Sequence, residues 1–453
     1  MKYSSLIGHT VEVLGDIQSS EQAADTIIGA FFRARKYLGS KDRRFVAEAT
    51  YGTLRHLRRC DHAIQSAAVP HENTTREGKL LLEVAAYLLV IEGRTDIAVK
   101  DFQELVDQDE EKERMGGVLS SLMAVRDTPA DESAVPAGIR WSFPEWMVER
   151  FRRDFGDDAE LLLSSLNEPP PLCVRVNTLK TNVDECRARL MAEGVSTEVS
   201  PISPLGLVIA KRVNMFALET FKEGWFEVQD DGSQVLPILI DPKPSAKVLD
   251  ACAGAGGKTL EFAALMKNRG EIVATDVHTN RLEELRRRTR RAGASNVRVK
   301  EVSSVADLAP DHTGWFDVVL VDAPCSGVGT IRRNPGMKWK VTERTVNELA
   351  VKQREILRQS APMVKPGGLL TYATCTLFCE ENEAVVNGFL EAHPEFTLED
   401  PGSRLERAHL SGASSGRFVK LLPHLHGTDG FFCAFLRRSP RITTPSPETA
   451  SSI

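Results

Sequence analysis

The stretch 247-KVLDACAGAGGKTLEFAALMKN-268 decides the fold that we predict for the second half of this chain. Its first six residues form a short, mostly apolar run that is typical of a buried strand, and residues 257–268 have the pattern of a helix. The turn between them consists of small residues, which let the backbone approach a ligand closely, while the following helix offers free N–H groups. This order predicts a ligand-binding α/β domain.

The alternation of strands and helices continues after this stretch. Short apolar runs predict strands at 271–277, 296–302, 316–322, 368–374 and 430–438. Helical patterns are found at 280–293, 343–363 and 380–393. Repeated β–α units imply a mostly parallel, Rossmann-like sheet with helices on both faces, so a ligand would lie across the carboxyl ends of the strands. We assign residues 241–438 to this domain.

The chain before this domain has two different patterns. Residues 1–126 show apolar residues at spacings of three and four and no strand pattern, so we predict a separate helical domain. Residues 127–143 are rich in Pro, Ala and acidic residues and predict a linker. In 144–240 a short helix at 144–156, with Pro in its first turn, precedes a βαβ-like module. The strands and helix of that module are predicted at 172–178, 183–194, 195–200 and 206–210.

Composition limits the class of protein. A chain of 453 residues with 42% hydrophobic and 26% charged residues is typical of a soluble protein of two or three domains. No apolar run approaches the roughly 20 residues that span a membrane, and no signal peptide is recognisable, so we expect a cytoplasmic protein. Residues 439–453 are rich in Pro, Ser and Thr and predict a disordered tail. We expect a monomer.

The eight cysteines are scattered and form no CxxC pair. Cys375 and Cys379 are spaced CxxxC without a second pair, so we expect no metal site and free thiols in a reducing compartment.

Charge is unevenly distributed although the net charge is −6. Residues 31–61 contain nine basic residues against three acidic ones, and residues 281–300 form a second basic cluster. Local basic patches of this kind are typical of nucleic-acid-binding surfaces, and solvated helix faces are the alternative.

Two acidic residues indicate what the glycine-rich turn could bind. Asp276 ends the second predicted strand about 20 residues after Gly257, the spacing at which an acid bonds a ribose hydroxyl pair; a helix N-cap is the other interpretation. Asp322 ends the fourth strand and would border the same crevice. The turn matches neither GxGxxG nor a P-loop. We therefore favour S-adenosylmethionine as the ligand, with a nicotinamide cofactor as the competitor.

Cys325 and Cys375 each follow a predicted strand and are flanked by small residues. Methylation of C5 of a pyrimidine needs a thiolate that adds to C6, because C5 is otherwise a poor nucleophile. The thiol must later be expelled, so a second thiol beside the first could assist release. A cysteine in 322-DAPC-325, where amine methyltransferases tend to have an aromatic residue, favours carbon as the acceptor. Two buried structural cysteines are the alternative.

The motifs between residues 144 and 436 together resemble those of the RsmB/Nop family, also called Sun or Fmu, of S-adenosylmethionine-dependent RNA cytosine-5 methyltransferases. The matching motifs are 144-PEWMVERFRRDFG-156, 175-RVNTLK-180, 229-QDDGSQ-234, 250-DACAGAGGKT-259, 322-DAPCSGVGTIRRNP-335, 338-KW-339, 374-TCTLFCEENE-383 and 429-DGFF-432. The N-terminal helices are similar to the NusB-like RNA-binding domain of the ribosomal-RNA members, and residues 171–228 correspond to a small RNA-recognition-like module.

The resemblance implies methylation of C5 of a cytidine in structured RNA, with small-subunit (16S) ribosomal RNA as the expected substrate. It implies that Cys375 is the nucleophile, that Cys325 helps release the product, and that Asp322 and Lys258 act beside them. The residues that it implies for cofactor binding are Cys252, Ala253, Gly254, Ala255, Gly256, Gly257, Lys258, Asp276, Ser303 and Asp322. The same chemistry on tRNA or another RNA, and a non-catalytic RNA-binding assembly factor, are the alternatives.

The chain departs from the family pattern at three positions. Ala255 stands where the family most often has Pro, Ser303 where it often has an Asp near the adenine, and Gly336 where it commonly has Asp. The loop keeps its small residues but loses the preset backbone angle of proline.

Overall fold

The computed structural model describes residues 1–67, 75–127, 135–211, 213–410 and 413–440. The chain divides into two compact units, of which the first consists of Met1–Pro169 and Ile331–Thr342. The second consists of Pro170–Thr330 and Glu343–Ile453. Residues 128–134 of the predicted linker and residues 441–453 of the predicted tail lie outside the described residues.

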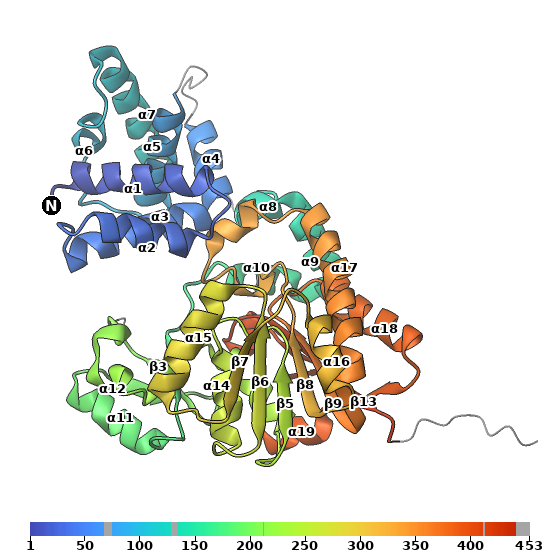
Figure 1. Cartoon of the computed structure of the whole chain (residues 1–453). Helices are drawn as coiled ribbons and strands as arrows, with labels where there is room; N and C mark the ends of the chain where they lie inside the picture. Colours follow the sequence, from blue (N-terminus) through green and yellow to red (C-terminus); the bar gives the residue numbers. More distant parts are fainter. Residues whose placement is uncertain (68–74, 128–134, 212, 411–412, 441–453) are drawn as a thin grey trace, which may run out of the picture. The chain divides into compact units, whose positions relative to one another are not determined.

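The described residues up to 127 form helices and no strand, as predicted. The helices are α1 (Tyr3–Gln18), α2 (Ala24–Ala34), α3 (Ser40–Arg55), α4 (Leu57–Ser66), α5 (Arg76–Ala86), α6 (Val99–Gln103) and α7 (Asp109–Asp127). Helix α1 packs on α3 and α5 (Figure 1), and one apolar core that includes Ile7, Leu14 and Leu119 joins them. Helix α5 continues directly into a π-helix, Tyr87–Ile91.

Three further helices belong to the first unit: α8 (Ala137–Arg140), α9 (Glu145–Phe155) and α10 (Ala159–Ser165). Pro144 is the N-cap of α9 and not part of its first turn, so this detail of the prediction was wrong. The helix ends, as expected, at Gly156, whose φ of 54° favours glycine.

The first unit also contains the segment Ile331–Thr342, which begins six residues after Cys325. Lys338 anchors it: the side chain is fully buried and its Nζ donates to the carbonyls of Arg55 and Ser142, at 2.8 and 2.9 Å. Nζ also donates to Oδ1 of Asn167 at 2.7 Å. A buried ammonium is stable only when acceptors replace its water, so these bonds fix the segment in the first unit.

A small antiparallel sheet opens the second unit. Its strands are β1 (Cys173–Val176), β2 (Thr197–Val199), β3 (Gly206–Ile209) and β4 (Phe226–Val228), in the order β2-β3-β1-β4. Since β3 is antiparallel to both neighbours, β1 and β2 are parallel and are joined by α11 (Val183–Ala192). The predicted βαβ pattern is therefore present, with β3 between its strands. Strand β4 was not predicted, because three residues give too short a pattern.

The large sheet has the order β11-β12-β13-β9-β8-β5-β6-β7. Its parallel strands are β5 (Lys247–Asp250), β6 (Glu271–Asp276), β7 (Val297–Glu301), β8 (Phe316–Asp322) and β9 (Val364–Thr374). Antiparallel strands extend it beyond β9 or pair with β13: β10 (Phe396–Leu398), β11 (Ser414–Ser415), β12 (Phe418–Leu421) and β13 (Phe431–Arg438). The predicted α/β class with a mostly parallel sheet is confirmed.

Helices cover both faces of this sheet (Figure 1). One face packs against α13 (Asp231–Ile240), α14 (Gly257–Leu265) and α15 (Thr279–Ala292), and the other packs against α17 (Glu343–Ser360) and α18 (Glu383–Ala392). Helices α14 and α17 are shorter than predicted. Residues 380–393 are not one helix, because a 3-10 turn, Cys379–Glu381, precedes α18. No helix in the described part of the chain is both long and apolar enough to cross a membrane.

Candidate active site

A cavity of about 850 Å³ lies at the carboxyl edge of the large sheet. The loop after β5, the residues that follow β6, β7 and β8, and helix α17 line it. The predicted site residues on its wall are Cys252, Ala253, Gly254, Ala255, Asp276, Ser303, Asp322, Cys325 and Cys375. Gly256, Gly257 and Lys258 were predicted with them but do not line the cavity. The ends of neighbouring parallel strands thus bring most of the predicted residues to one place.

The glycine-rich loop is held in its shape by Asp276. Gly254 and Gly256 adopt φ of 55° and 85°, and a Cβ on Gly256 would lie 2.0 Å from Leu285. One oxygen of Asp276 accepts the N–H of Gly254 and the other accepts the N–H of His278, both at 2.9 Å. Asp276 is therefore not the N-cap of α15, which is His278. Its carboxylate joins the loop to the end of β6.

Two arginines tie this loop to the small sheet, and sequence reasoning missed both. Arg175 on β1 donates to the carbonyl of Gly257 at 2.7 Å and pairs with buried Glu261 at 2.9 Å. Arg288 on α15 donates to the carbonyl of Ala255 at 2.8 Å and pairs with Glu227 on β4 at 2.9 Å. The shape of the loop therefore depends on the neighbouring module.

Lys258, behind the cavity wall, forms an ion pair with Asp322 on that wall, with 2.6 Å between Nζ and Oδ2. Burial alone would lower the pKa of Lys258, but Asp322, Cys375 and Asp250 outweigh it, so the pKa is raised and the side chain stays charged. Burial raises the pKa of Asp250 to about 7; Thr259 donates to this carboxyl at 2.6 Å. The site thus holds the Lys258 cation beside the carboxyl group of Asp322 and close to that of Asp250.

The two thiols meet at the ends of adjacent strands β8 and β9. Sγ of Cys325 lies 3.4 Å from Sγ of Cys375. The N–H of Gly329 donates to the carbonyl of Cys375 at 3.0 Å, which holds the loop after β8 against the end of β9. The hydrogen bond with Cys375, then burial and the nearby charges of Cys375 and Glu381, raise the pKa of Cys325 well above its ordinary value. Within this pair, Cys325 therefore favours its protonated form.

Comparison with known proteins identifies the family. The profile of the 16S rRNA methyltransferase RsmB/F family matches residues 237–437, and that of the RsmF/B-like ferredoxin-like domain matches residues 143–216. A probable ribosomal RNA small subunit methyltransferase B from Synechocystis is 30% identical over 438 residues, which cover 94% of this chain and 98% of the relative. The chain belongs to the RsmB/F methyltransferase family. The resemblance found in the sequence is thereby confirmed.

Two solved structures similar to this RsmB/F chain extend the comparison to the fold. The crystal structure of PH0851 gives a TM-score of 0.77 at 28% identity, covering 97% of this chain and 99% of that one. A methyltransferase homologue from Pyrococcus horikoshii gives a TM-score of 0.58 at 30% identity, covering 68% of this chain and all of that one. The fold is therefore shared with PH0851 along nearly all of the chain and with the methyltransferase homologue along about two thirds of it.

Ser303 lies on the cavity wall of this RsmB/F chain, and as a serine it offers a ligand no carboxylate. Its N–H donates to Oδ2 of Asp307 at 2.8 Å, as does the N–H of Ser304 at 3.0 Å. An acid is thus present four residues later, but its carboxylate caps the 3-10 helix Val305–Leu308.

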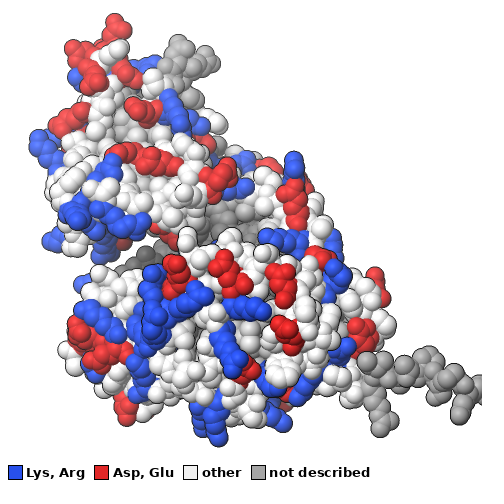
Figure 2. Space-filling view, viewed as in Figure 1, with Lys and Arg blue, Asp and Glu red and all other residues white. Residues whose placement is uncertain are grey.

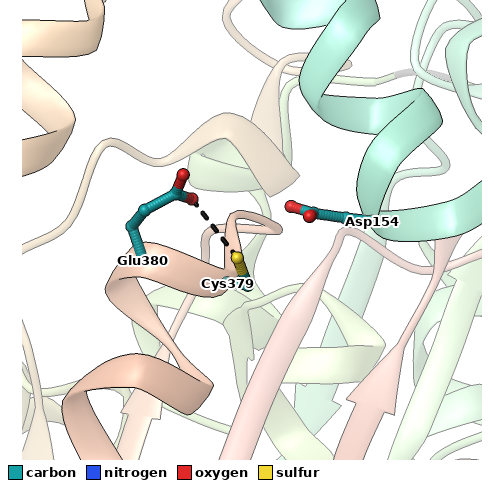
Figure 3. A group of neighbouring side chains, drawn as sticks. All are labelled: Asp154, Cys379 and Glu380. Carbon is teal, nitrogen blue, oxygen red and sulfur yellow. Dashed lines mark hydrogen bonds between the residues drawn. The ribbon is translucent and has the colours of Figure 1, made fainter.

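The other cysteine near this edge, Cys379, lies in the 3-10 turn after the Cys375 loop. Its thiol donates to Oε2 of Glu380 at 3.5 Å (Figure 3). Neither residue lines the cavity, so the CxxxC spacing does not bring Cys379 into the site with Cys375.

Some residues of the two basic clusters are bonded within the structure, and others are exposed. Arg55 is buried and donates to the carbonyl of Arg332, and Arg58 donates to that of Phe143, so both are structural. Arg33 on α2, Lys36 between α2 and α3, and Lys41 on α3 are exposed. Figure 2 shows basic side chains gathered over this part of the first unit and over α15 of the second. On α15, the exposed basic residues are Arg281, Arg287 and Arg290.

Proposed function

We propose that this protein transfers a methyl group from S-adenosylmethionine to C5 of a cytidine in small-subunit ribosomal RNA. The thiol pair carries the proposal, because Cys325 and Cys375 lie 3.4 Å apart on the wall of one cavity. C5 of cytosine becomes nucleophilic only when a thiolate adds to C6. A second thiol beside the first fits a reaction in which that sulfur must later leave.

The cavity fits S-adenosylmethionine. A Cβ placed on Gly254 would meet no atom within 4 Å, so the loop leaves room for close approach of a ligand. The carboxylate of Asp276 has lone pairs beyond its two backbone bonds, as ribose hydroxyls require. When bound, S-adenosylmethionine supplies the methyl group that C5 receives.

Charge distinguishes the two thiols and supports Cys375 as the nucleophile. The ammonium of Lys258 interacts with Cys375, whereas the carboxylate of Glu381 interacts with Cys325. A neighbouring cation stabilises a thiolate and a neighbouring anion opposes one. On this assignment Cys375 carries the negative charge and Cys325 keeps its proton, an order that sequence reasoning from the residues had left open.

The assigned steps conserve atoms and electrons. The thiolate of Cys375 forms a bond to C6, the C5=C6 electron pair moves to C5, and Asp322 shares a proton with N3 of the base. C5 then takes the methyl group with this electron pair, and the electrons of the broken bond stay on the donor sulfur. The C5 proton passes to a carboxylate or water, from which Cys325 can later be reprotonated, and the C–H electron pair rebuilds C5=C6. The S–C6 pair returns to Cys375, and Cys325 donates its S–H to the departing sulfur.

The assignment of the substrate rests on relatives. The Synechocystis relative carries the name ribosomal RNA small subunit methyltransferase B, and the family profile names 16S rRNA. The exposed basic residues of α2, α3 and α15 supply cations that phosphates of such an RNA require. The target base must be accessible or turned out of its stack to reach the cavity.

The test compares RNA substrates. Purified protein with labelled S-adenosylmethionine is given small-subunit rRNA, large-subunit rRNA or tRNA from a strain that lacks the protein, and modified positions are mapped by bisulfite sequencing. We expect one protected cytidine, in small-subunit rRNA. Protection in tRNA alone would reject the substrate, a labelled but unprotected base would reject C5, and no transfer to any RNA would favour the non-catalytic alternative.

A further inference from the structure

Glu381 is a buried carboxylate that bonds to both cysteine loops. It has no exposed surface. Oε1 accepts the N–H of Ser326 at 2.8 Å and the side-chain amide of Gln353 at 3.0 Å. Oε2 accepts the hydroxyls of Ser326 and Thr376, at 2.5 and 2.9 Å. Four donors satisfy this carboxylate, so it is stable as an anion away from water.

The donors to Glu381 are the residues that directly follow the two thiols. Ser326 follows Cys325 and Thr376 follows Cys375, and their hydroxyls lie 2.8 Å apart. The last paired residues of the β8–β9 ladder are Asp322 and Ala373, so both loops have already left the ladder at Ser326 and Thr376. Beyond the ladder, the bonds to Glu381 therefore join the two loops, in addition to the backbone bond from Gly329 to Cys375.

The position of Glu381 is itself fixed. Its carbonyl accepts the hydroxyl of Tyr372 at 2.6 Å, and the next residue, Asn382, donates to the carbonyl of Thr376 at 3.1 Å. Oδ1 of Asn382 also accepts the hydroxyl of Thr374 at 2.6 Å. These hydrogen bonds hold the turn that carries Glu381 against the end of β9.

We propose that Glu381 is a positioning residue that holds the two thiols in register and places a fixed negative charge beside Cys325. The inference rests on the proposed function for its consequence in catalysis. The consequence is that Cys325 retains its proton, because Glu381 is among the groups that raise the pKa of this thiol. Glu381 would thereby determine which sulfur attacks and which one assists release.

Two kinds of variant separate the charge of Glu381 from its hydrogen bonds to the two loops, which we call the clamp. Glu381→Gln removes the charge but keeps the bonds, because the hydroxyls of Ser326 and Thr376 can turn to accept from the new amide. Ser326→Ala and Thr376→Val each remove one arm and keep the charge. Glu391→Gln is the matched control, since Glu391 is exposed on α18.

The first readout needs no RNA and so does not depend on the proposed function. Alkylation of Cys325 and Cys375 by iodoacetamide is followed against pH by peptide mass spectrometry. In the wild type we expect Cys375 to react faster at neutral pH. In Glu381→Gln the preference should fall about tenfold, the effect of one pKa unit, with an unchanged melting temperature. A preference equal to that of Glu391→Gln would overturn the inference.

The second readout is adduct formation with RNA. Ser326→Ala and Thr376→Val should each slow formation of the protein–RNA adduct, and the double variant should lose less than the product of the two factors, because both act through Glu381. Independent, multiplicative losses would reject the shared clamp. If alkylation responds as expected but no RNA forms an adduct, the positioning role stands and the proposed function fails.

Discussion

The ammonium of Lys258, in the first turn of α14, lies 2.6 Å from the carboxylate of Asp322 at the end of β8. Lys258→Met removes the cation that faces both Asp322 and Cys375, so we expect methyl transfer in a single turnover to slow by about 100-fold. Lys258→Arg keeps the charge and should retain more activity than Met. The control is Lys267→Met, an exposed lysine just beyond the same helix. A Lys258→Met enzyme with the wild-type rate would reject the assigned role.

The raised pKa of Asp250, about 7, predicts a pH dependence of stability. Since burial favours the neutral acid, the folded protein binds this proton more tightly than the unfolded chain does. The contribution of protonated Asp250 to the free energy of unfolding is fully present below about pH 4 and is lost as the pH rises through about 7. Asp250→Asn should lack this loss. Urea titrations between pH 4 and 8 measure it, and parallel curves for both proteins would contradict the prediction.

Arg288 should control cofactor affinity although it does not line the cavity. Its guanidinium holds the carbonyl of Ala255 and is itself held by Glu227. Losing a charge-assisted bond of this kind should weaken binding of S-adenosylhomocysteine to Arg288→Met about tenfold, as measured by calorimetry. Arg287→Met is the control, because Arg287 pairs with Glu284 on the same exposed helix face. Equal affinities in the two variants would show that the loop holds its own shape.

The exposed cations predict how RNA binding depends on salt. Replacing Arg33, Lys36 and Lys41 together by Ala should reduce the slope of log Kd against log salt by about 2, since each lost phosphate contact contributes about 0.7 to 0.9. Arg290→Ala should reduce it by less than 1. Arg358→Ala, whose guanidinium pairs with Glu355, is expected to leave the slope unchanged. An unaltered slope in the triple variant would place the RNA elsewhere.

How far the sequence predicts this molecule depends on the range of each interaction. The parallel strands could be predicted because each is an apolar run before a turn, and Asp276, Asp322, Cys325 and Cys375 follow from their places at strand ends. The short antiparallel strands, such as β10 and β12, have too few residues to give a pattern.

The groups that support the site could not be predicted in the same way. The sequence predicts Glu381 only as part of the start of a helix. Its bond to Ser326 forms because β8 and β9 are adjacent in the sheet. Arg288 reads as one of several surface arginines, and its bond to Ala255 requires α15 to be packed beside the loop. Local patterns locate elements and strand ends, whereas these contacts depend on tertiary packing.

The central claim is that Cys375 bonds to C6 and Cys325 allows its release. The most direct measurement mixes wild type, Cys325→Ala and Cys375→Ala with substrate RNA and S-adenosylmethionine and separates them on a denaturing gel. We predict that Cys325→Ala migrates as a stable protein–RNA adduct, while Cys375→Ala forms none and transfers no methyl group. A Cys375→Ala enzyme that still methylates RNA, or a Cys325→Ala protein that never shifts, would contradict the account.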